Sequence, residues 1–488
     1  MQSARPERAS LREAKKGEAR TMHRAHTRRS AMKVLLVEPA YRNKYPPLGL
    51  MKIASFHRGL GDEVQFVKGC DRGLAGKSWD RIYVTSLFSF YWSETIKTIR
   101  FYEFSTREPQ GLIIGGPMAT IMSAEIESET GYTVVRGLLN ERGKLGLEGD
   151  ESVDSASPDY SILEQTEYKY PASDAYFAYA TRGCIRRCSF CAVPTLEPKF
   201  IGYLPILDQI RATDEKYGQK RDLLLLDNNI LASSKFDKII DEIQEAGFTK
   251  GAKLRGRNRH VDFNQGIDLR LLTREKMKRL AELPVLPLRL AFDHFALRDQ
   301  YVQKVELAAE FGIKRISCYV LYNYRDTPDD FYARLKTNVE LNRRLGTRVF
   351  SFPMRYVPID RRDRTFVGEY WTARYLRGIQ CILNATHGVV GPKKPFFKAA
   401  FGSSVSEFKK LLLMPDRYII FRRKHRSNGA ARWNKQYAAL KPAQKNELHK
   451  ILSNDLRRDM KQANPAVKRL LLHYHRRTEK HKSQLALF

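Results

Sequence analysis

The chain has 488 residues, 42% of them hydrophobic, which is enough for about three ordinary domain cores. No stretch approaches the roughly 18 consecutive apolar residues of a membrane helix, and six cysteines are too few for a disulfide framework, so we expect a cytoplasmic protein with no membrane partner. The formal net charge of +32 is unevenly distributed, and such a field attracts polyanions.

The first 31 residues carry nine Lys and Arg against three Glu and almost nothing apolar. Such a segment cannot bury a core, so we predict a disordered basic tail over 1–31. A mitochondrial presequence and a start codon placed too early are the alternatives.

Residues 32–140 alternate between apolar strands and helical stretches. The expected strands are 34–37, 63–67, 82–86 and 112–116. This alternation predicts a doubly wound parallel sheet, a Rossmann-like domain. Residues 141–175 show no periodicity and are predicted to be a linker or an extended crossing segment.

A second α/β series occupies residues 176–360. Its expected strands are 178–181, 223–227, 262–269, 288–292, 315–321 and 349–354. Six strand–helix units predict a partial (β/α)6 TIM-type barrel, whose active site would lie at the carboxyl ends of the strands. A helical connection over 361–395 and a basic, mostly helical C-terminal domain over 396–488 complete the chain.

The first barrel strand is followed by a cysteine triplet with the spacing C-x3-C-x2-C, formed by Cys184, Cys188 and Cys191. Three thiolates can hold a [4Fe–4S] cluster and leave one iron open, whereas ordinary ferredoxin clusters use four cysteines. Gly183 would permit the tight turn, and Arg182, Arg186 and Arg187 would favour thiolates. A zinc site is the alternative, but structural zinc takes four ligands and no histidine lies within ten residues.

The triplet, with Phe190 before its last cysteine and six strand–helix units around it, resembles the radical S-adenosylmethionine (SAM) superfamily over about residues 175–360. The resemblance implies that SAM binds the open iron. It also implies that an electron donor such as flavodoxin or ferredoxin drives formation of a 5′-deoxyadenosyl radical.

Residues 32–140, with Gly115-Gly116-Pro117, resemble the cobalamin-binding-type domain of many such proteins. The cobalt-ligand motif Asp-x-His-x-x-Gly is missing and His57 is the only histidine of the region, so both a cobalamin-bound and an empty domain stay open.

The same resemblance implies polar SAM contacts at the strand ends. The candidates are Asp227, Asn228, Asn264, Asp268, Arg270 and Asp293. Asp227 and Asn228 would bind the amino group, and the later residues the ribose and the carboxylate. Helix capping by Asp227 and an internal pair between Asp268 and Arg270 are the alternatives.

The composition of the C-terminal domain indicates the class of substrate. Residues 396–488 hold 22 Lys and Arg against six Asp and Glu, interleaved with aromatic residues. The leading hypothesis is therefore a radical SAM enzyme that modifies RNA. The alternatives are a radical SAM enzyme, possibly a cobalamin-dependent methyltransferase, that acts on a small molecule or peptide, and a non-catalytic iron–sulfur protein that binds nucleic acid.

Overall fold

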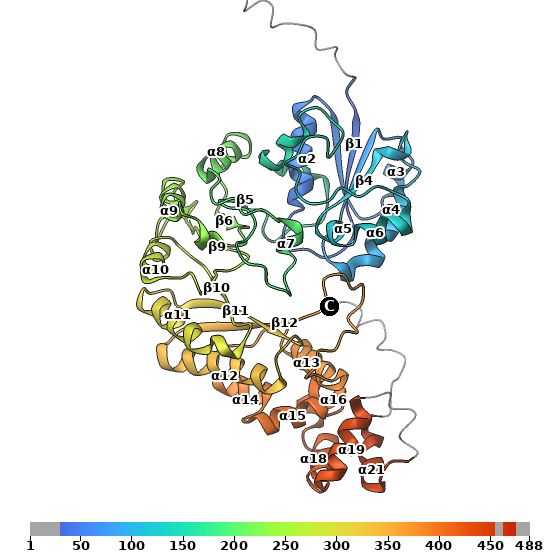
Figure 1. Ribbon diagram of the computed structural model, residues 1–488, viewed down its shortest axis with the longest axis vertical. Helices are drawn as coiled ribbons and strands as arrows, with labels where there is room; N and C mark the ends of the chain where they lie inside the picture. Colours follow the sequence, from blue (N-terminus) through green and yellow to red (C-terminus); the bar gives the residue numbers. More distant parts are fainter. Residues whose placement is uncertain (1–29, 454–461, 475–488) are drawn as a thin grey trace, which may run out of the picture.

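The computed structural model describes residues 30–453 and 462–474 as three parts that follow one another along the long axis (Figure 1). An α/β domain lies at one end, a strongly curved set of strands in the middle, and a helical domain at the other end. The predicted tail lies outside the described residues except for 30 and 31. Among the described residues, no helix is both long and apolar enough to cross a membrane.

The N-terminal domain contains one four-stranded parallel sheet in the order β2-β1-β3-β4. Its strands are β1 (Lys33–Glu38), β2 (Glu63–Lys68), β3 (Arg81–Thr85) and β4 (Leu112–Gly115).

Helices cover both faces of this sheet. They are α2 (Leu48–Gly59) on one face, and α3 (Arg72–Ala75), α4 (Trp92–Tyr102), α5 (Pro117–Ile121) and α6 (Ser123–Thr130) on the other. Val34 and Leu36 belong to the core of the α2 face, while Leu35 and Val37 belong to the opposite core. The predicted doubly wound, Rossmann-like fold is thus confirmed, with its topological switch point between β1 and β3.

Residues 141–175 form part of a packed interface and are not a free linker. They contain two 3-10 helices, η3 (Asp150–Ser155) and η4 (Tyr160–Gln165). Val153 and Ile162 are fully buried in the same core as α2, and Phe177 of the first barrel strand joins that core. Such short helices produce no periodic apolar pattern, which is why the sequence indicated a linker.

The middle of the chain contains six parallel strands, as predicted. They are β5 (Ala175–Ala178), β6 (Asp222–Leu225), β9 (Val261–Phe263), β10 (Leu288–Ala291), β11 (Arg315–Tyr322) and β12 (Arg348–Arg355). They form two three-stranded sheets, β5-β6-β9 and β10-β11-β12, joined by parallel bridges between Val261 and Val285 and between Ile267 and Leu290. This arrangement is a partial barrel, whose six strands follow one another in Figure 1.

Helices and one small hairpin connect these strands. The helices are α7 (Val193–Leu196), α8 (Ile206–Tyr217), α9 (Phe236–Glu245), α10 (Arg274–Ala281), α11 (Arg298–Glu310) and α12 (Pro328–Leu345), and the hairpin is β7 (Lys253–Leu254) with β8 (Arg257–Asn258). Helix α12 begins with a complete capping box, which Thr327 forms with Asp330.

The expected third strand, 262–269, is wrong in its length. The strand ends at Phe263, because Gly266 adopts a φ of 94° and its N–H closes a turn on the carbonyl of Phe263 (2.9 Å). Asn264, Asp268 and Arg270 therefore lie on a loop at the carboxyl end of β9, and strand alternation does not arrange them.

The C-terminal part is helical, as predicted. It contains α13 (Ala373–Ala385), α14 (Lys394–Phe401), α15 (Val405–Leu413), α16 (Asp416–Ile420), α17 (Arg422–His425), α18 (Gly429–Ala438), α19 (Pro442–Ser453) and α21 (Pro465–Leu471). Phe331 and Tyr332 of α12 pack against Phe408 of α15, so the barrel and the helical domain share one core.

Candidate active site

The three cysteines lie on the loop that follows β5, at the carboxyl end of the barrel, and all three are half-buried. The loop turns at Gly183, whose φ is 68°. A Cβ atom at this position would lie 2.3 Å from the carbonyl oxygen of Lys199, so no other residue fits. The predicted role of Gly183 is confirmed.

One buried carboxylate holds this loop. Glu197 accepts hydrogen bonds from the backbone N–H of Gly183 (2.6 Å) and from Nη1 of Arg182 (2.8 Å). Arg182 also pairs with Asp154 of η3. Because Arg182 is buried between two acids, it fixes the loop to the 141–175 segment and does not raise the local potential as expected. Arg187, in contrast, is exposed.

Polar groups of the cysteine loop itself and of the loops after β6 and β9 lie around Cys184. The backbone N–H of Arg186 and Nδ2 of Asn229 each lie 3.4 Å from the sulfur of Cys184. Asn229 also donates to Asp268 (3.3 Å), and Nε of Arg186 pairs with the same carboxylate (2.7 Å). The loops after β5, β6 and β9 thus converge on one point.

Asp268 and Arg270 form an internal pair, the alternative that the sequence left open. Nε and Nη2 of Arg270 lie 2.7 and 3.2 Å from the two carboxylate oxygens of Asp268. Burial acts against ionisation of Asp268, but the bonds from Arg270 and Arg186 hold its pKa below the usual range. Arg270 also contacts the thiol of Cys188.

A cavity of about 290 Å³ opens beside the cysteine loop. The residues that line it are Arg187, Cys188, Ser189, Phe190, Ile267, Asp268, Leu269, Arg270, Ala291, Asp293, His294, Leu297, Tyr324 and Arg325. They come from the loops after β5, β9, β10 and β11. Burial raises the pKa of Asp293. The ring of Tyr324 packs on that of Phe190 (5.6 Å), so the fifth strand end meets the cysteine loop.

The structure separates the six predicted SAM contacts into two groups. Asp268, Arg270 and Asp293 line the cavity together with Cys188. The other three, Asp227, Asn228 and Asn264, form hydrogen bonds with residues that do not line the cavity.

Each of these three bonds to a different element. Asp227 is buried and accepts bonds from the backbone N–H and the hydroxyl of Thr181, and burial raises its pKa to about 6. Asn228 donates to Glu197 (2.9 Å), and Asn264 donates to the hydroxyl of Tyr45 in the N-terminal domain (2.6 Å). The SAM contacts of all six residues stay predictions.

Sequence reasoning missed three residues of the site, which are Glu197, Asn229 and Tyr324. Glu197 had one available signal, since it is the only charged residue between Cys191 and Lys199 and follows a loop with three arginines. Asn229 and Tyr324 had none beyond their position after a strand, because their roles depend on contacts between segments far apart in the sequence.

The cysteine loop suits a cluster. Its thiols are half-buried beside a cavity, and two N–H groups point at the sulfur of Cys184, as hydrogen bonds to a thiolate require. Within residues 30–453 and 462–474, no three His, Cys, Asp or Glu side chains converge as the ligands of a single ion would. A cubane differs from such a site because each thiolate binds a separate iron.

The N-terminal domain offers cobalamin no histidine ligand. His57 is fully buried, and its two ring nitrogens contact Asp62 (2.7 Å) and the hydroxyl of Tyr83 (2.8 Å). At the switch point, however, the rings of Phe88 and Phe90 are stacked (5.0 Å) and both are about half exposed, whereas Tyr41, which stacks on Tyr91, is buried. Phe88 and Phe90 thus form an exposed aromatic surface.

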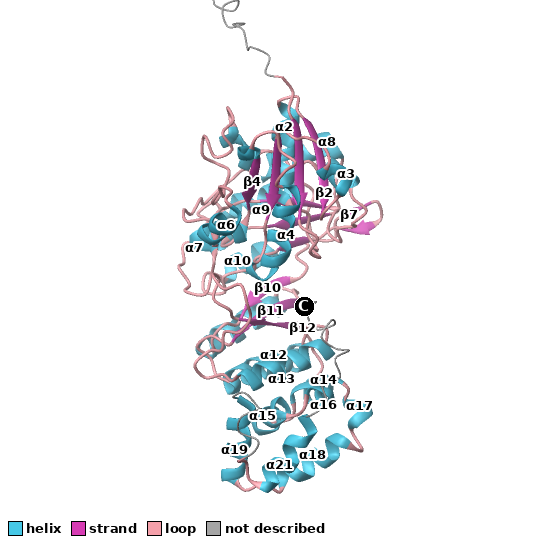
Figure 2. Cartoon of the chain, turned by 90° about the vertical axis from the view of Figure 1, so that its right-hand side faces the viewer, coloured by secondary structure: helices cyan, strands magenta, loops and turns pink. Residues whose placement is uncertain are grey.

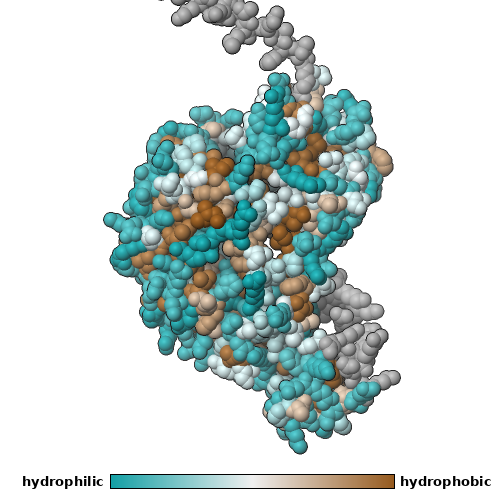
Figure 3. All heavy atoms as spheres, in the orientation of Figure 1, coloured by the Kyte–Doolittle hydropathy of each residue, from teal (hydrophilic) through white to brown (hydrophobic). Residues whose placement is uncertain are grey.

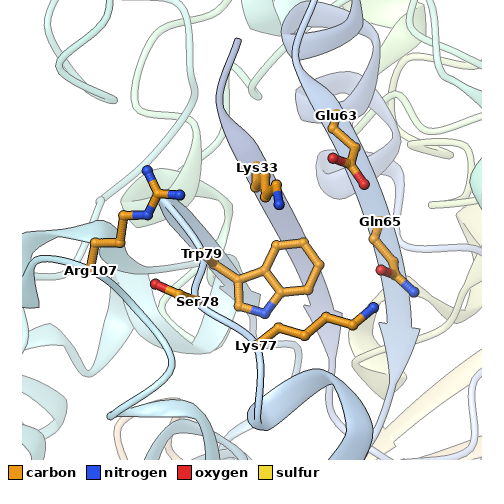
Figure 4. Close-up of a pocket in the computed structure, with 7 residues that line it drawn as sticks. All are labelled: Lys33, Glu63, Gln65, Lys77, Ser78, Trp79 and Arg107. Carbon is orange, nitrogen blue, oxygen red and sulfur yellow. The ribbon is translucent and has the colours of Figure 1, made fainter. Parts of the chain in front are cut away.

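A second hollow, of about 350 Å³, lies at the opposite edge of the N-terminal sheet (Figure 4). It is lined by Lys33, Glu63, Gln65, Lys77, Ser78, Trp79 and Arg107. These residues lie at or near the amino ends of β1, β2 and β3, away from the strand ends that approach the barrel. The hollow is therefore separate from the cysteine site.

The sequence matches no model of a protein family and no curated protein. Among solved structures, the chain is similar to the radical SAM methyltransferase TsrM from Kitasatospora setae, determined with tryptophan substrate and a SAM analogue bound. The TM-score is 0.51 at 15% sequence identity, covering 71% of this chain and 76% of TsrM.

The fold of the chain is therefore similar to that of TsrM. The cobalamin-dependent SAM radical enzyme OxsB is also similar, with a TM-score of 0.40 and 12% identity over 64% of this chain and 52% of OxsB. The predicted fold, a Rossmann-like domain followed by a partial barrel, is confirmed. In this fold, the cysteine loop follows the first barrel strand, where the sequence placed it.

Proposed function

We propose that the protein is a radical SAM enzyme that holds a [4Fe–4S] cluster on Cys184, Cys188 and Cys191. The observation that carries this proposal is that the cysteine loop and the cavity meet. Cys188 lines the cavity together with Asp268 and Arg270. A cofactor bound to the cluster there would lie directly beside the space for a substrate.

The residues of the chain have separable tasks in this proposal. When bound, the reduced cluster supplies the electron that cleaves the sulfonium of SAM. Glu197 and Arg182 fix the loop, and Arg270 can share its guanidinium between Asp268 and the carboxylate of SAM, since five N–H donors allow two partners. Phe190 and Tyr324 close one side of the cavity and limit the access of water.

Methyl transfer to a small molecule or a peptide is the reaction that the comparisons favour. TsrM is a methyltransferase whose structure contains tryptophan. The cavity of about 290 Å³ has room for a group of similar size. Cobalamin would be the natural methyl carrier, in contact with the exposed rings of Phe88 and Phe90 and without a histidine ligand.

Modification of RNA is the second candidate, and it is favoured by charge. Residues 417–446 contain no Asp or Glu and nine Lys and Arg. A single nucleobase is also small enough for the cavity if it is turned out of its strand. The proposed radical chemistry would then act on one nucleobase of a bound RNA.

Reconstitution without oxygen tests the proposed chemistry. We expect about four irons per chain, and release of 5′-deoxyadenosine or S-adenosylhomocysteine when dithionite and SAM are added. Cys188→Ala should lose both properties, while Cys70→Ala, at an exposed cysteine outside the site, should retain them. Equal iron contents in the two variants would contradict the proposal, and the visible spectrum of the wild type shows whether cobalamin is present.

A further inference from the structure

The helical domain carries a stretch in which the positive charge has no acidic counterpart. Residues 417–446 cover α17, α18 and most of α16, and all nine charged side chains are cationic. Two of them are structural. Arg417 donates to the carbonyl of His473 (3.2 Å), and Arg422 donates to that of Ala400 (2.8 Å). These two arginines hold helices together and are not available to a partner.

Five others form a surface that the fold does not use. Arg423, Lys424, Arg426, Arg432 and Lys435 are all exposed, and none of them makes an ion pair with a described residue. Like charges this close repel one another, so their clustering costs stability unless an anion binds. An extended polyanion would satisfy several of them together.

Phe421 lies next to these cations and is 49% exposed. Tyr418 (4% exposed) and Trp433 (0% exposed) belong to the core, and the partly buried Tyr437 stacks on Trp433. A large ring left in solvent beside arginines and lysines can stack on a nucleobase while the cations contact the phosphates.

We propose that the α17–α18 basic surface, formed by Phe421, Arg423, Lys424, Arg426, Arg432 and Lys435, binds a single-stranded nucleic acid. The cations would contact backbone phosphates, and Phe421 would stack on one base. This binding does not depend on the proposed chemistry. Only the further step, that the bound strand is the substrate, rests on the proposed function.

A membrane surface is a poorer match for this region. A helix that lies on a membrane needs a broad exposed apolar face, whereas Ala430 and Trp433 of α18 point into the core. On the face seen in Figure 3, larger hydrophobic groups gather over the barrel and the N-terminal domain, and the helical domain is mostly hydrophilic. Figure 2 places α17 and α18 at the end of the molecule remote from the N-terminal domain.

Fluorescence anisotropy with the full chain and a labelled 20-nucleotide single-stranded RNA of mixed sequence tests the proposal. The variant R423Q/K424Q/R426Q should bind at least tenfold more weakly at 100 mM salt. The slope of log K against log salt should become shallower by about 2, because each phosphate contact on a single strand contributes about 0.7. The matched control is K250Q/K253Q/R257Q in and next to the β7–β8 hairpin, which also removes three exposed cations.

The control variant should bind like the wild type. Equal losses in the two triple variants would overturn the proposal, since they would show attraction to net charge alone. Phe421→Ala should weaken binding at least about fivefold with an unchanged salt slope, as loss of one stacked base predicts. Unchanged affinity would remove Phe421 from the surface and overturn the stacking part.

Binding measurements with other ligands identify the partner. DNA of the same sequence shows whether the sugar matters, and binding of either strand supports the proposal. If R423Q/K424Q/R426Q loses affinity for phosphatidylserine vesicles but retains affinity for RNA and DNA, the proposal is wrong. SAM cleavage by the same samples separates the two proposals, because nucleic-acid binding without cleavage refutes the proposed enzyme and leaves this surface standing.

Discussion

Each half of the barrel contains a buried arginine that pairs with a carboxylate, and these two arginines do different things. Arg182, in the β5-β6-β9 half, joins the cysteine loop to Glu197 and to Asp154 of the preceding segment. Arg334 of α12, in the β10-β11-β12 half, donates to the carbonyls of Phe292 and Leu321 and pairs with Asp326 (2.6 Å).

The difference reflects how the two sheets are built. Strands β11 and β12 have eight residues each, whereas β5 and β6 have four and β9 has three. Short strands share few backbone hydrogen bonds, so the cysteine half needs side-chain ties to position its loops. The second half has two long strands, although its β10 has only four residues, and its helix α12 packs directly against α15 of the helical domain. The first half is therefore organised for the site, and the second for stability.

The largest expected effect is on Arg334. Arg334→Met should lower the free energy of unfolding by about 3–5 kcal/mol, because Asp326 would stay buried without its cation. Arg182→Met should cost less, since Asp154 is 21% exposed and can be hydrated, and Glu197 retains the bonds from the N–H of Gly183 and from Asn228. Urea unfolding followed by circular dichroism measures both. Arg274→Met, at a surface pair with Glu310, is the control and should change nothing measurable.

Equal losses for Arg334→Met and Arg182→Met would contradict the division between the two halves. So would a larger loss for Arg182→Met, because the cysteine loop would then belong to the part of the fold that determines stability.

The sequence revealed the strands and the cysteine loop because both have local signals. Apolar runs bounded by glycine or polar residues indicated six barrel strands, although the first, expected at 178–181, lies at Ala175–Ala178, and the spacing of three cysteines identified the loop. The misjudged elements lack such signals. The turn at Gly266 follows β9 directly and continues its polar–apolar alternation, so the strand was expected to run on.

The hydrogen bonds and ion pairs within the site could not be predicted from local sequence patterns, for a different reason. Asn264 bonds to Tyr45, 219 residues away, and Arg182 pairs with Asp154 in a segment without periodicity. Acids and arginines are common on surfaces, so nothing in the sequence distinguishes a buried partner from a solvated one. Only the folded arrangement shows that Glu197 belongs to the cysteine loop.

Asp227 provides a pH-dependent test of the first half. Burial raises its pKa to about 6, and the bonds from Thr181 offset this only in part. Between about pH 4 and pH 6 the folded state retains a proton that the unfolded state releases, so the contribution of this group to stability falls as the pH rises through that window. A shift of about two units corresponds to at most about 3 kcal/mol.

Asp227→Asn retains an oxygen to accept the bonds from Thr181 and never ionises. The stability of the variant relative to the wild type should therefore rise between pH 4.5 and pH 7.5 by about 2 kcal/mol, as measured by urea unfolding at three pH values. A stability difference that stays constant across this range would show that Asp227 is not the buried, high-pKa carboxyl described here.

The smallest expected change in stability, and the most specific test of the site, is at Glu197. Glu197→Gln retains the size of the side chain but presents an NH2 group to Arg182 or to Gly183, each of which is itself a donor. One buried donor then lacks a partner, which should cost about 1–3 kcal/mol. Because the affected bonds hold the cysteine loop, the reconstituted variant should also lose iron to a chelator several-fold faster than the wild type.

Glu242→Gln is the matched control for this variant. Its carboxylate lies in the same half of the barrel, is 12% exposed against 10% for Glu197, and accepts bonds from Tyr203 and from the backbone of Ile206. It should show a similar loss of stability with no faster release of iron. If the two variants release iron at the same rate, the cluster responds to general loosening of the barrel half, and the side-chain tie at Glu197 has no special role in positioning the site.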